Sequence, residues 1–284
     1  MASTFTSSSN SDAQQTKEEI KPWIRRLARF GFMAKGTVYM LIGLLTFMAV
    51  IGVGGGKTTG TSGMFRAVAQ VAFGEILLWA VAVGLFAYII WRLIEAVLDP
   101  GNKGSDAKGI ITRIAYVVAA AIYGGIAYNA VKIAMNAGSS GGSTEKTMSA
   151  KLLSQPFGQW LVGIVGLIII GYAAYEFYKG ASGGFMKSFN IGDMDEHRLK
   201  VAKTSGRFGL SARGIVLGLI GFFFIRTAMT SNPDEAKGMD GALSEISQQP
   251  FGQILLGTAG LGLILYGIYQ IVRGRYIRMN FGAK

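Results

Sequence analysis

Residues 52–59, GVGGGKTT, are the stretch of this sequence that comes nearest to a known chemical site. A phosphate-binding loop needs Gly, four residues and then Gly-Lys-Ser/Thr, placed between a strand and a helix so that backbone N–H groups surround the phosphates. Five positions before Gly56, however, the sequence has Ile51 instead of glycine, and an apolar run precedes the loop where a strand is needed. The pattern therefore predicts no nucleotide site, and we interpret 52–59 as a flexible loop.

Composition removes most other catalytic and metal chemistry. The chain has no Cys, which excludes thiolate ligands, cysteine nucleophiles and disulfides. Its single histidine, His197, argues against a zinc site or a serine–histidine pair, and we interpret it as a surface residue. An acidic stretch lacks the spacing of a calcium loop and is interpreted as a solvated loop: Asp234, Glu235, Asp240 and Glu245. We expect no enzyme, no catalytic residue, no metal site and no bound cofactor.

Long apolar segments make up much of the chain, and any functional polar group must be positioned by them. Half of the 284 residues are hydrophobic and only 15% are charged, whereas soluble domains have about 25% charged residues. Each run has about the 20 residues that cross a hydrocarbon core as a helix, which satisfies its own backbone hydrogen bonds. The runs are roughly Gly31–Val53, Gly74–Leu98, Ile110–Met135, Phe157–Lys179, Phe208–Met229 and Phe251–Arg273. The sequence predicts an all-α integral membrane protein with six transmembrane helices.

The six runs form three repeats. A shift of 84 residues carries Arg29 to Arg113 and Tyr88 to Tyr172, and a shift of 178 carries Arg29 to Arg207. The spacing from this arginine to a Phe-Gly pair is 44 residues in every copy. Because all three copies run in the same direction, we expect parallel helical-hairpin repeats with pseudo-threefold symmetry about the membrane normal.

The repeats divide the chain into segments. We expect a disordered cytoplasmic tail over 1–22, repeat 1 over 23–100, repeat 2 over 101–180, a cytoplasmic amphipathic linker over 181–206, repeat 3 over 207–279 and a short tail over 280–284. Two stretches ahead of the even-numbered spans, Ser149–Gln155 and Ala242–Gln249, predict short helices at the membrane interface.

Positive charge sets the orientation. Of the 28 Lys and Arg residues, 21 flank the side of the termini and seven flank the other side. Since basic residues in short loops stay in the cytoplasm, both termini are expected there, in a multi-pass protein of the bacterial inner membrane. The net charge of +12 is then explained by this topology and by contact with anionic lipid headgroups. We expect no nucleic-acid partner.

Small residues seven positions apart mark one face of the odd-numbered spans. These are Gly36 and Gly43 in the first copy and Gly214 and Gly221 in the third. Such residues let helix backbones approach closely in lipid, so we expect them at helix–helix contacts.

Charged residues near the inner boundary are the candidates for a binding role. The equivalent residues Arg29, Arg113 and Arg207 begin the odd-numbered spans, and Lys132 and Arg226 lie 19 residues further on. These two levels lie about 100° apart around an ideal helix, so they do not form one pore-facing stripe. We expect a belt that contacts anionic lipid or forms ion pairs and that holds these residues: Arg29, Arg113, Arg207, Lys35, Arg213, Glu95 and Glu176.

The third copy carries the most specific motifs of the chain. These are Arg207-Phe208-Gly209, Ala212-Arg213-Gly214, Gly238–Leu243 and Gln249-Pro250-Phe251-Gly252. From Ile24 to Met279 the chain resembles the bacterial domain-of-unknown-function family 1206, and the second copy departs most from that pattern, with Ala115 and Ala119. The resemblance implies a multi-spanning membrane domain in three tandem copies and implies no activity.

Two function classes follow from these features. The first is a non-enzymatic structural or accessory component of the membrane or of a membrane complex. The alternative is a channel or transporter that carries a small anion or a lipid along the pseudo-threefold axis. A membrane-protein partner and a homo-oligomer are both left open.

Overall fold

The computed structural model describes residues 5–52, 60–100, 104, 106–135 and 144–277, and within these ranges the fold is built from helices. The α-helices are α1 (Phe5–Val50), α2 (Thr61–Ala69), α3 (Gly74–Leu98), α4 (Ala107–Ala134), α5 (Thr144–Leu153), α6 (Gly158–Ser182), α7 (Glu196–Thr230), α8 (Met239–Gln248) and α9 (Gly252–Tyr276). Three short 3-10 helices join them: η1 (Gly184–Ser188), η2 (Ile191–Asp193) and η3 (Pro233–Glu235).

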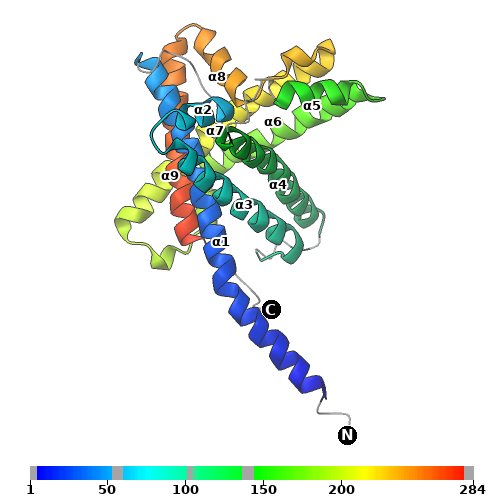
Figure 1. Ribbon diagram of the computed structural model, residues 1–284, viewed down its shortest axis with the longest axis vertical. Helices are drawn as coiled ribbons and strands as arrows, with labels where there is room; N and C mark the ends of the chain where they lie inside the picture. The colour runs from blue at the N-terminus through cyan, green and yellow to red at the C-terminus, as the bar shows by residue number, and fades with distance from the viewer. Residues whose placement is uncertain (1–4, 53–59, 101–103, 105, 136–143, 278–284) are drawn as a thin grey trace.

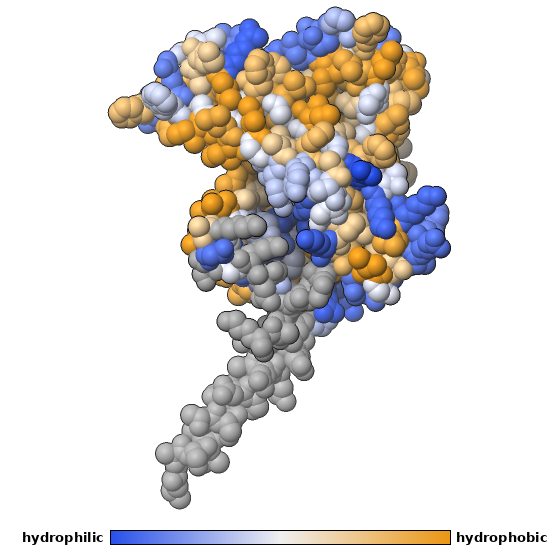
Figure 2. All heavy atoms as spheres, turned by 180° about the vertical axis from the view of Figure 1, so that it is seen from behind, coloured by the Kyte–Doolittle hydropathy of each residue, from blue (hydrophilic) through white to orange (hydrophobic). Residues whose placement is uncertain are grey.

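Six of these helices are long and apolar enough to cross a membrane. They are α1 from Pro22 onwards, α3, α4 from Gly109 onwards, α6, α7 and α9. Much of the surface is accordingly apolar, and Figure 2 shows this as a broad orange area below a more hydrophilic upper edge. The prediction of an all-α protein with six membrane spans is confirmed.

Each repeat consists of a long helix, a short helix and a second long helix. The helices α5 and α8 lie where the sequence predicts short interfacial helices, whereas α2 is a third such helix that sequence reasoning missed. Figure 1 shows α2, α5 and α8 in the upper part of the molecule, opposite the end from which α1 emerges. The predicted loop 52–59 falls, apart from Gly52, outside the described residues.

The first helix starts earlier than expected. It begins at Phe5 and continues through Pro22 into the first span, so helix is present over most of the segment for which the polar composition predicted a disordered tail. Disorder of this segment in solution stays a prediction. Residues 278–284, which include the second predicted tail, lie outside the described ranges.

The linker between α6 and α7 is fastened to the end of α9. The backbone N–H of Asn190 donates to the carbonyl of Tyr276 at 2.8 Å, and the Arg198 guanidinium donates to the Tyr276 hydroxyl at 2.6 Å. Phe185 is buried, with its ring centroid 5.4 Å from that of Tyr269. The linker thus holds the start of α7 and the end of α9 together, and His197 lies exposed on the first turn of α7.

A strained Phe-Gly turn begins the second long helix of every repeat. Phe73, Phe157 and Phe251 have φ between 60° and 62°, a left-handed conformation that side chains rarely adopt. The glycine that follows each one packs on the last turn of the preceding short helix, where a Cβ would collide with a backbone carbonyl. This geometry explains why the Phe-Gly pair stands at the same register in all three repeats.

The spanning helices pack most closely between repeats. α1 packs on α9, α4 on α3 and α7 on α6, so each odd-numbered span lies against the second span of another repeat. Gly36 and Gly43 face α9, and Gly214 and Gly221 face α6. A Cβ at Gly43 would lie 2.5 Å from the Gly260 carbonyl oxygen, which shows how closely the two backbones approach.

The second repeat is open. In the first and third repeats the two long helices also pack on each other, α1 on α3 and α7 on α9, but α4 and α6 have no such extensive contact. Figure 1 shows the α3–α4 pair and the α6–α7 pair tilted in different directions. The helical arrangement therefore lacks one of the six contacts that a closed threefold ring requires.

Side-chain volume explains the open repeat. Gly31 and Gly209 lie against the backbones of Tyr88 and Tyr266, where a Cβ would collide, and the equivalent residue of the second repeat is Ala115. The tightly packed Ala–Gly contacts of the other two repeats are likewise replaced by larger side chains. Ala34 and Ala212 correspond to Val118, and Gly84 and Gly262 correspond to Ile168. Val118 and Ile168 are exposed on α4 and α6.

Candidate functional site: a buried polar cluster

The three equivalent arginines that begin the odd-numbered spans do not form a belt with the carboxylates. Arg29 and Arg207 are exposed. Arg113 donates to the carbonyl oxygens of Ala96 and Val97, at 2.5 and 3.0 Å, and so caps the last turn of α3. Among the described residues, no hydrogen bond or ion pair links these arginines to Glu95 or Glu176.

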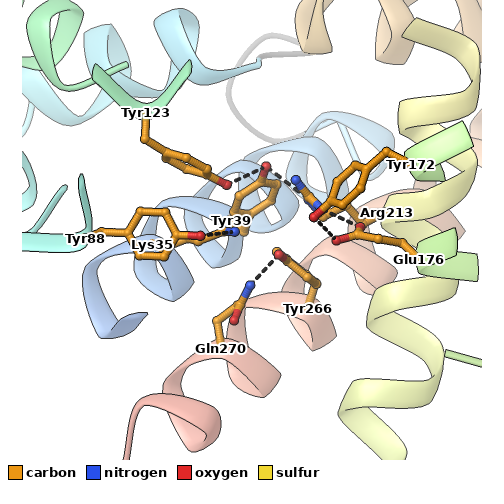
Figure 3. Close-up of polar contacts among 9 residues, drawn as sticks. All are labelled: Lys35, Tyr39, Tyr88, Tyr123, Tyr172, Glu176, Arg213, Tyr266 and Gln270. Atoms are coloured by element: carbon orange, nitrogen blue, oxygen red, sulfur yellow. Dashed lines mark hydrogen bonds and ion pairs between the residues drawn. The ribbon is translucent and has the colours of Figure 1, made fainter. Parts of the chain in front are cut away.

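Lys35 and Arg213, which were predicted for the same belt, are instead buried inside the bundle. They occupy equivalent positions of repeats 1 and 3 and are 3% and 5% exposed. Each lies six residues further along its helix than the boundary arginine, which carries it about 9 Å deeper at 1.5 Å per residue. Figure 3 shows the polar cluster that surrounds them, to which every spanning helix contributes.

Tyrosine rings enclose the Lys35 ammonium group. Its Nζ lies 4.9 Å from the ring centre of Tyr88, 4.6 Å from that of Tyr123 and 5.7 Å from that of Tyr266. It also donates a hydrogen bond of 3.1 Å to the Tyr88 hydroxyl. Cation–π attraction of this kind is strongest when the cation is shielded from water, so the three rings replace part of the lost hydration.

Arg213 pairs with a carboxylate across two helices. Its guanidinium, on α7, forms an ion pair with Glu176 on α6, and its Nε donates to the Tyr39 hydroxyl on α1 at 3.2 Å. The Tyr172 hydroxyl donates to the other oxygen of Glu176 at 2.8 Å. Both members of the pair are almost fully buried, and the network links α1, α6 and α7.

Two further contacts extend the cluster to α4 and α9. The hydroxyl groups of Tyr39 and Tyr123 lie 3.3 Å apart, and Gln270 donates from Nε2 to the Tyr266 hydroxyl. The Tyr39 and Tyr266 rings meet edge to face, with their centroids 4.8 Å apart. These contacts join residues from all three repeats at one level of the bundle.

A second ionic layer lies one turn closer to the end of the bundle at which α3 and α9 finish. Arg92 on α3 donates to the Tyr88 hydroxyl at 2.7 Å and forms an ion pair with Glu95. Arg92 and Glu95 are three residues apart on one helix face, whereas Glu176 forms its ion pair across helices with Arg213. Arg273 on α9 lies over the Phe32 ring, with Cζ 4.8 Å from the ring centre.

Repeat positions explain how the cluster arises. Tyr88, Tyr172 and Tyr266 are equivalent, and the residues one turn further on, Arg92, Glu176 and Gln270, are equivalent too. Sequence reasoning missed Arg92 and Gln270 as cluster members. The available signal was their spacing of four residues from the repeated tyrosine, which places both side chains on the same helix face.

The chemistry of the cluster is that of hydrogen-bond donors and cations. Four basic and two acidic side chains gather there: Lys35, Arg92, Arg213, Arg273, Glu95 and Glu176. In the described part of the chain, His, Asp and Glu side chains form no group of three or more that could hold a metal ion. Buried tyrosine and basic groups are suited to fixing helices to one another or to binding an anion.

A helical bundle with six spans, three internal repeats and a buried ionic cluster defines a multi-pass integral membrane protein of repeat architecture. The chain belongs to the family described as Domain of Unknown Function (DUF1206), which matches it three times in tandem, at residues 30–99, 114–183 and 208–276. The matches begin 84 and 178 residues apart from the first, so they have the registers found in the sequence and confirm the three repeats.

A relative of similar length is similar to the chain along nearly all of its sequence. The chain is 42% identical over 265 residues to the uncharacterized protein YxxB of Bacillus subtilis (strain 168), an alignment that covers 93% of this chain and 95% of the relative. No solved structure matches the chain.

Proposed function

We propose that the protein is a non-enzymatic structural or accessory component of the membrane. The observation that carries this proposal is the polar cluster, because its side chains come from all six spanning helices and bond one another inside the bundle. Side chains bonded in this way fix the helices in one arrangement and, as we interpret it, leave no continuous path for a permeating ion across the described part of the bundle. Lipid with anionic headgroups is the expected surrounding partner, because the helix ends carry many basic residues.

The proposal is tested by measuring anion flux through purified protein in liposomes. We expect chloride and phosphate release no faster than from protein-free liposomes, because Arg213, Glu176 and the tyrosines are buried and bond one another across the interior of the bundle. The comparison variant replaces Arg29, Arg113 and Arg207 by Gln. Robust flux through the wild type that disappears in this variant, with folding intact, would reject the structural role.

A second candidate, transport of a small anion or a lipid, is favoured by two observations. The cluster contains more basic than acidic groups, and the second repeat is open between α4 and α6. Tyr172, which bonds Glu176, is 43% exposed on this side, so the edge of the cluster reaches the lipid-facing surface. The same apolar opening would suit a membrane-protein partner or a second copy of the chain.

We propose that the membrane is the bacterial cytoplasmic membrane and that both termini face the cytoplasm. The surplus of basic residues on the side of the termini supports this orientation. A cytoplasm-active reporter fused after Ala283 or after Asp106 is expected to give signal, and one inserted within 138–142 is expected to be silent. Signal from the 138–142 fusion alone would reverse the orientation.

A further inference from the structure

We propose that the inner end of the bundle holds a binding site for a phosphate group, between α1, α3 and α9. The residues that would bind it are Lys35, Tyr88, Arg92, Gln270 and Arg273. The site goes beyond the structural role proposed above, since an accessory protein and a transporter would each accommodate it.

Two aromatic rings gather the basic groups at this place. Arg92 and Arg273 both lie over Phe32, with Cζ at 5.4 and 4.8 Å from the ring centre. The Phe32 ring meets Tyr88 edge to face, with centroids 5.5 Å apart, and Tyr88 accepts hydrogen bonds from Lys35 and Arg92. Three cationic side chains from three helices therefore surround one pair of rings.

The charges at this place do not balance. Arg213 is paired with Glu176 and Arg92 with Glu95, but Lys35 and Arg273 form no ion pair in the described part of the chain. Cations that leave water without a counter-charge are costly, and in a membrane they are normally paired. A bound anion would supply the missing negative charge.

Hydrogen-bond accounting points to the same conclusion. The Tyr88 oxygen accepts from both Lys35 and Arg92, so the hydroxyl proton of this phenol needs an acceptor, and none is present among the described residues. The Nε–H of Arg273 is buried and also lacks an acceptor. The Tyr88 hydroxyl and the Arg273 Nε–H therefore both need an acceptor, and an anionic oxygen would be one.

Gln270 completes the donor set. The side chain is 2% exposed, and its Oε1 has no hydrogen-bond partner while Nε2 donates to the Tyr266 hydroxyl. Rotation of the amide by 180° would let Tyr266 donate to the oxygen and would turn both N–H groups into available donors. Gln270 and Arg273 are three residues apart on α9, so their side chains lie on one helix face.

The ligand chemistry follows from the number and charge of the donors. Three cations with several N–H groups match an anion that has several charged oxygens, as a phosphate has, better than they match a halide. Arg273 is only partly buried and lies three residues before the end of α9, so it is the member of the site nearest that end of the bundle. Two sources supply this chemistry, the free phosphate ion and the headgroup of an anionic lipid.

The test measures thermal unfolding of the full-length protein in two arms. In the first, nanodiscs of phosphatidylcholine receive inorganic phosphate, with chloride at equal ionic strength as the reference. In the second, the nanodiscs contain phosphatidylglycerol and the buffer contains no phosphate. A ligand that binds only the folded protein raises the unfolding temperature. A rise in the first arm identifies the free ion as a ligand, and a rise in the second alone identifies the lipid headgroup.

Variants locate the site. Lys35→Met and Arg273→Gln are expected to weaken binding by about tenfold or more, the loss of one charge-assisted hydrogen bond. Arg275→Gln is the matched control, because Arg275 is exposed on the same turn of α9 and should bind as the wild type does. If Lys35→Met does not fold, the unfolding temperatures of Arg273→Gln and of the wild type in the two arms still test the proposal. The proposal is overturned by a wild type that shows no rise in either arm, or by an Arg273→Gln variant that binds as well as the control.

Discussion

Leucine in place of Gly43 is expected to lower the stability of the bundle by about 3 kcal/mol, the upper part of the range for overpacking a tight contact. Even a Cβ at this position would lie 2.5 Å from the Gly260 carbonyl oxygen and 2.7 Å from the backbone nitrogen of Ile264. Neither backbone atom can move without displacing α9 from α1. The expected result is a fall in the unfolding temperature in detergent, by about 2–4 °C for each kcal/mol.

A second variant, at the equivalent position of the third repeat, and a control variant at an exposed glycine accompany this experiment. Gly221→Leu should behave like Gly43→Leu, because a Cβ there would meet Ile170 and the Gly166 carbonyl of α6. Gly125→Leu is the control, since Gly125 is exposed on α4 with nothing within 4 Å of an added Cβ. Equal stability of all three variants would show that the α1–α9 and α6–α7 contacts are looser than described.

Removal of Glu176 is expected to be the most damaging single change in the polar cluster. Glu176→Leu leaves the Arg213 guanidinium buried, and the Tyr39 hydroxyl is then its one hydrogen-bond partner in the described part of the chain. An unpaired buried charge of this kind typically destabilises a protein by about 3–5 kcal/mol. Unfolding monitored by tryptophan fluorescence in detergent should therefore shift to a much lower temperature.

The double variant separates the charge from the packing. Arg213→Met combined with Glu176→Leu removes both charges, and we expect it to recover a large part of the lost stability, as hydrophobic replacements of buried ion pairs often do. A double variant that is less stable than either single variant would contradict this expectation. It would show that the ion pair stabilises the bundle by more than the hydrophobic side chains that replace it.

Much of the fold could be predicted from the sequence because a membrane restricts the possibilities. Six apolar runs of sufficient length and one arginine register repeated three times were enough to define the spans and the repeats. The short helix α2 was missed because it directly follows the glycine-rich stretch 52–59, which drew the interpretation toward a loop.

The polar cluster was harder to predict, because burial depends on what the neighbouring helices contribute. Lys35 and Arg213 were expected in a belt at the inner boundary that contacts anionic lipid or forms ion pairs, yet both lie inside the bundle among tyrosines that include residues of other repeats. The open second repeat had a clearer sequence signal, since Val118 and Ile168 are larger than the residues at the equivalent positions. Reading that signal requires knowing which helix face carries the contact, and only the assembled helices show this.

The contact between α1 and α9 has a consequence for biosynthesis. These two helices are the first and last spans of the chain, and about 200 residues separate the end of one from the start of the other. At a synthesis rate of about 5–20 residues per second, the glycine face of α1 waits about 10–40 seconds before it can meet α9, whereas Tyr88 and Tyr123, which contact Lys35, are made earlier, on α3 and α4. Tyrosines of α3 and α4 can therefore enclose Lys35 during synthesis, but the contact between the first and last of these spans forms only once α9 is in the membrane.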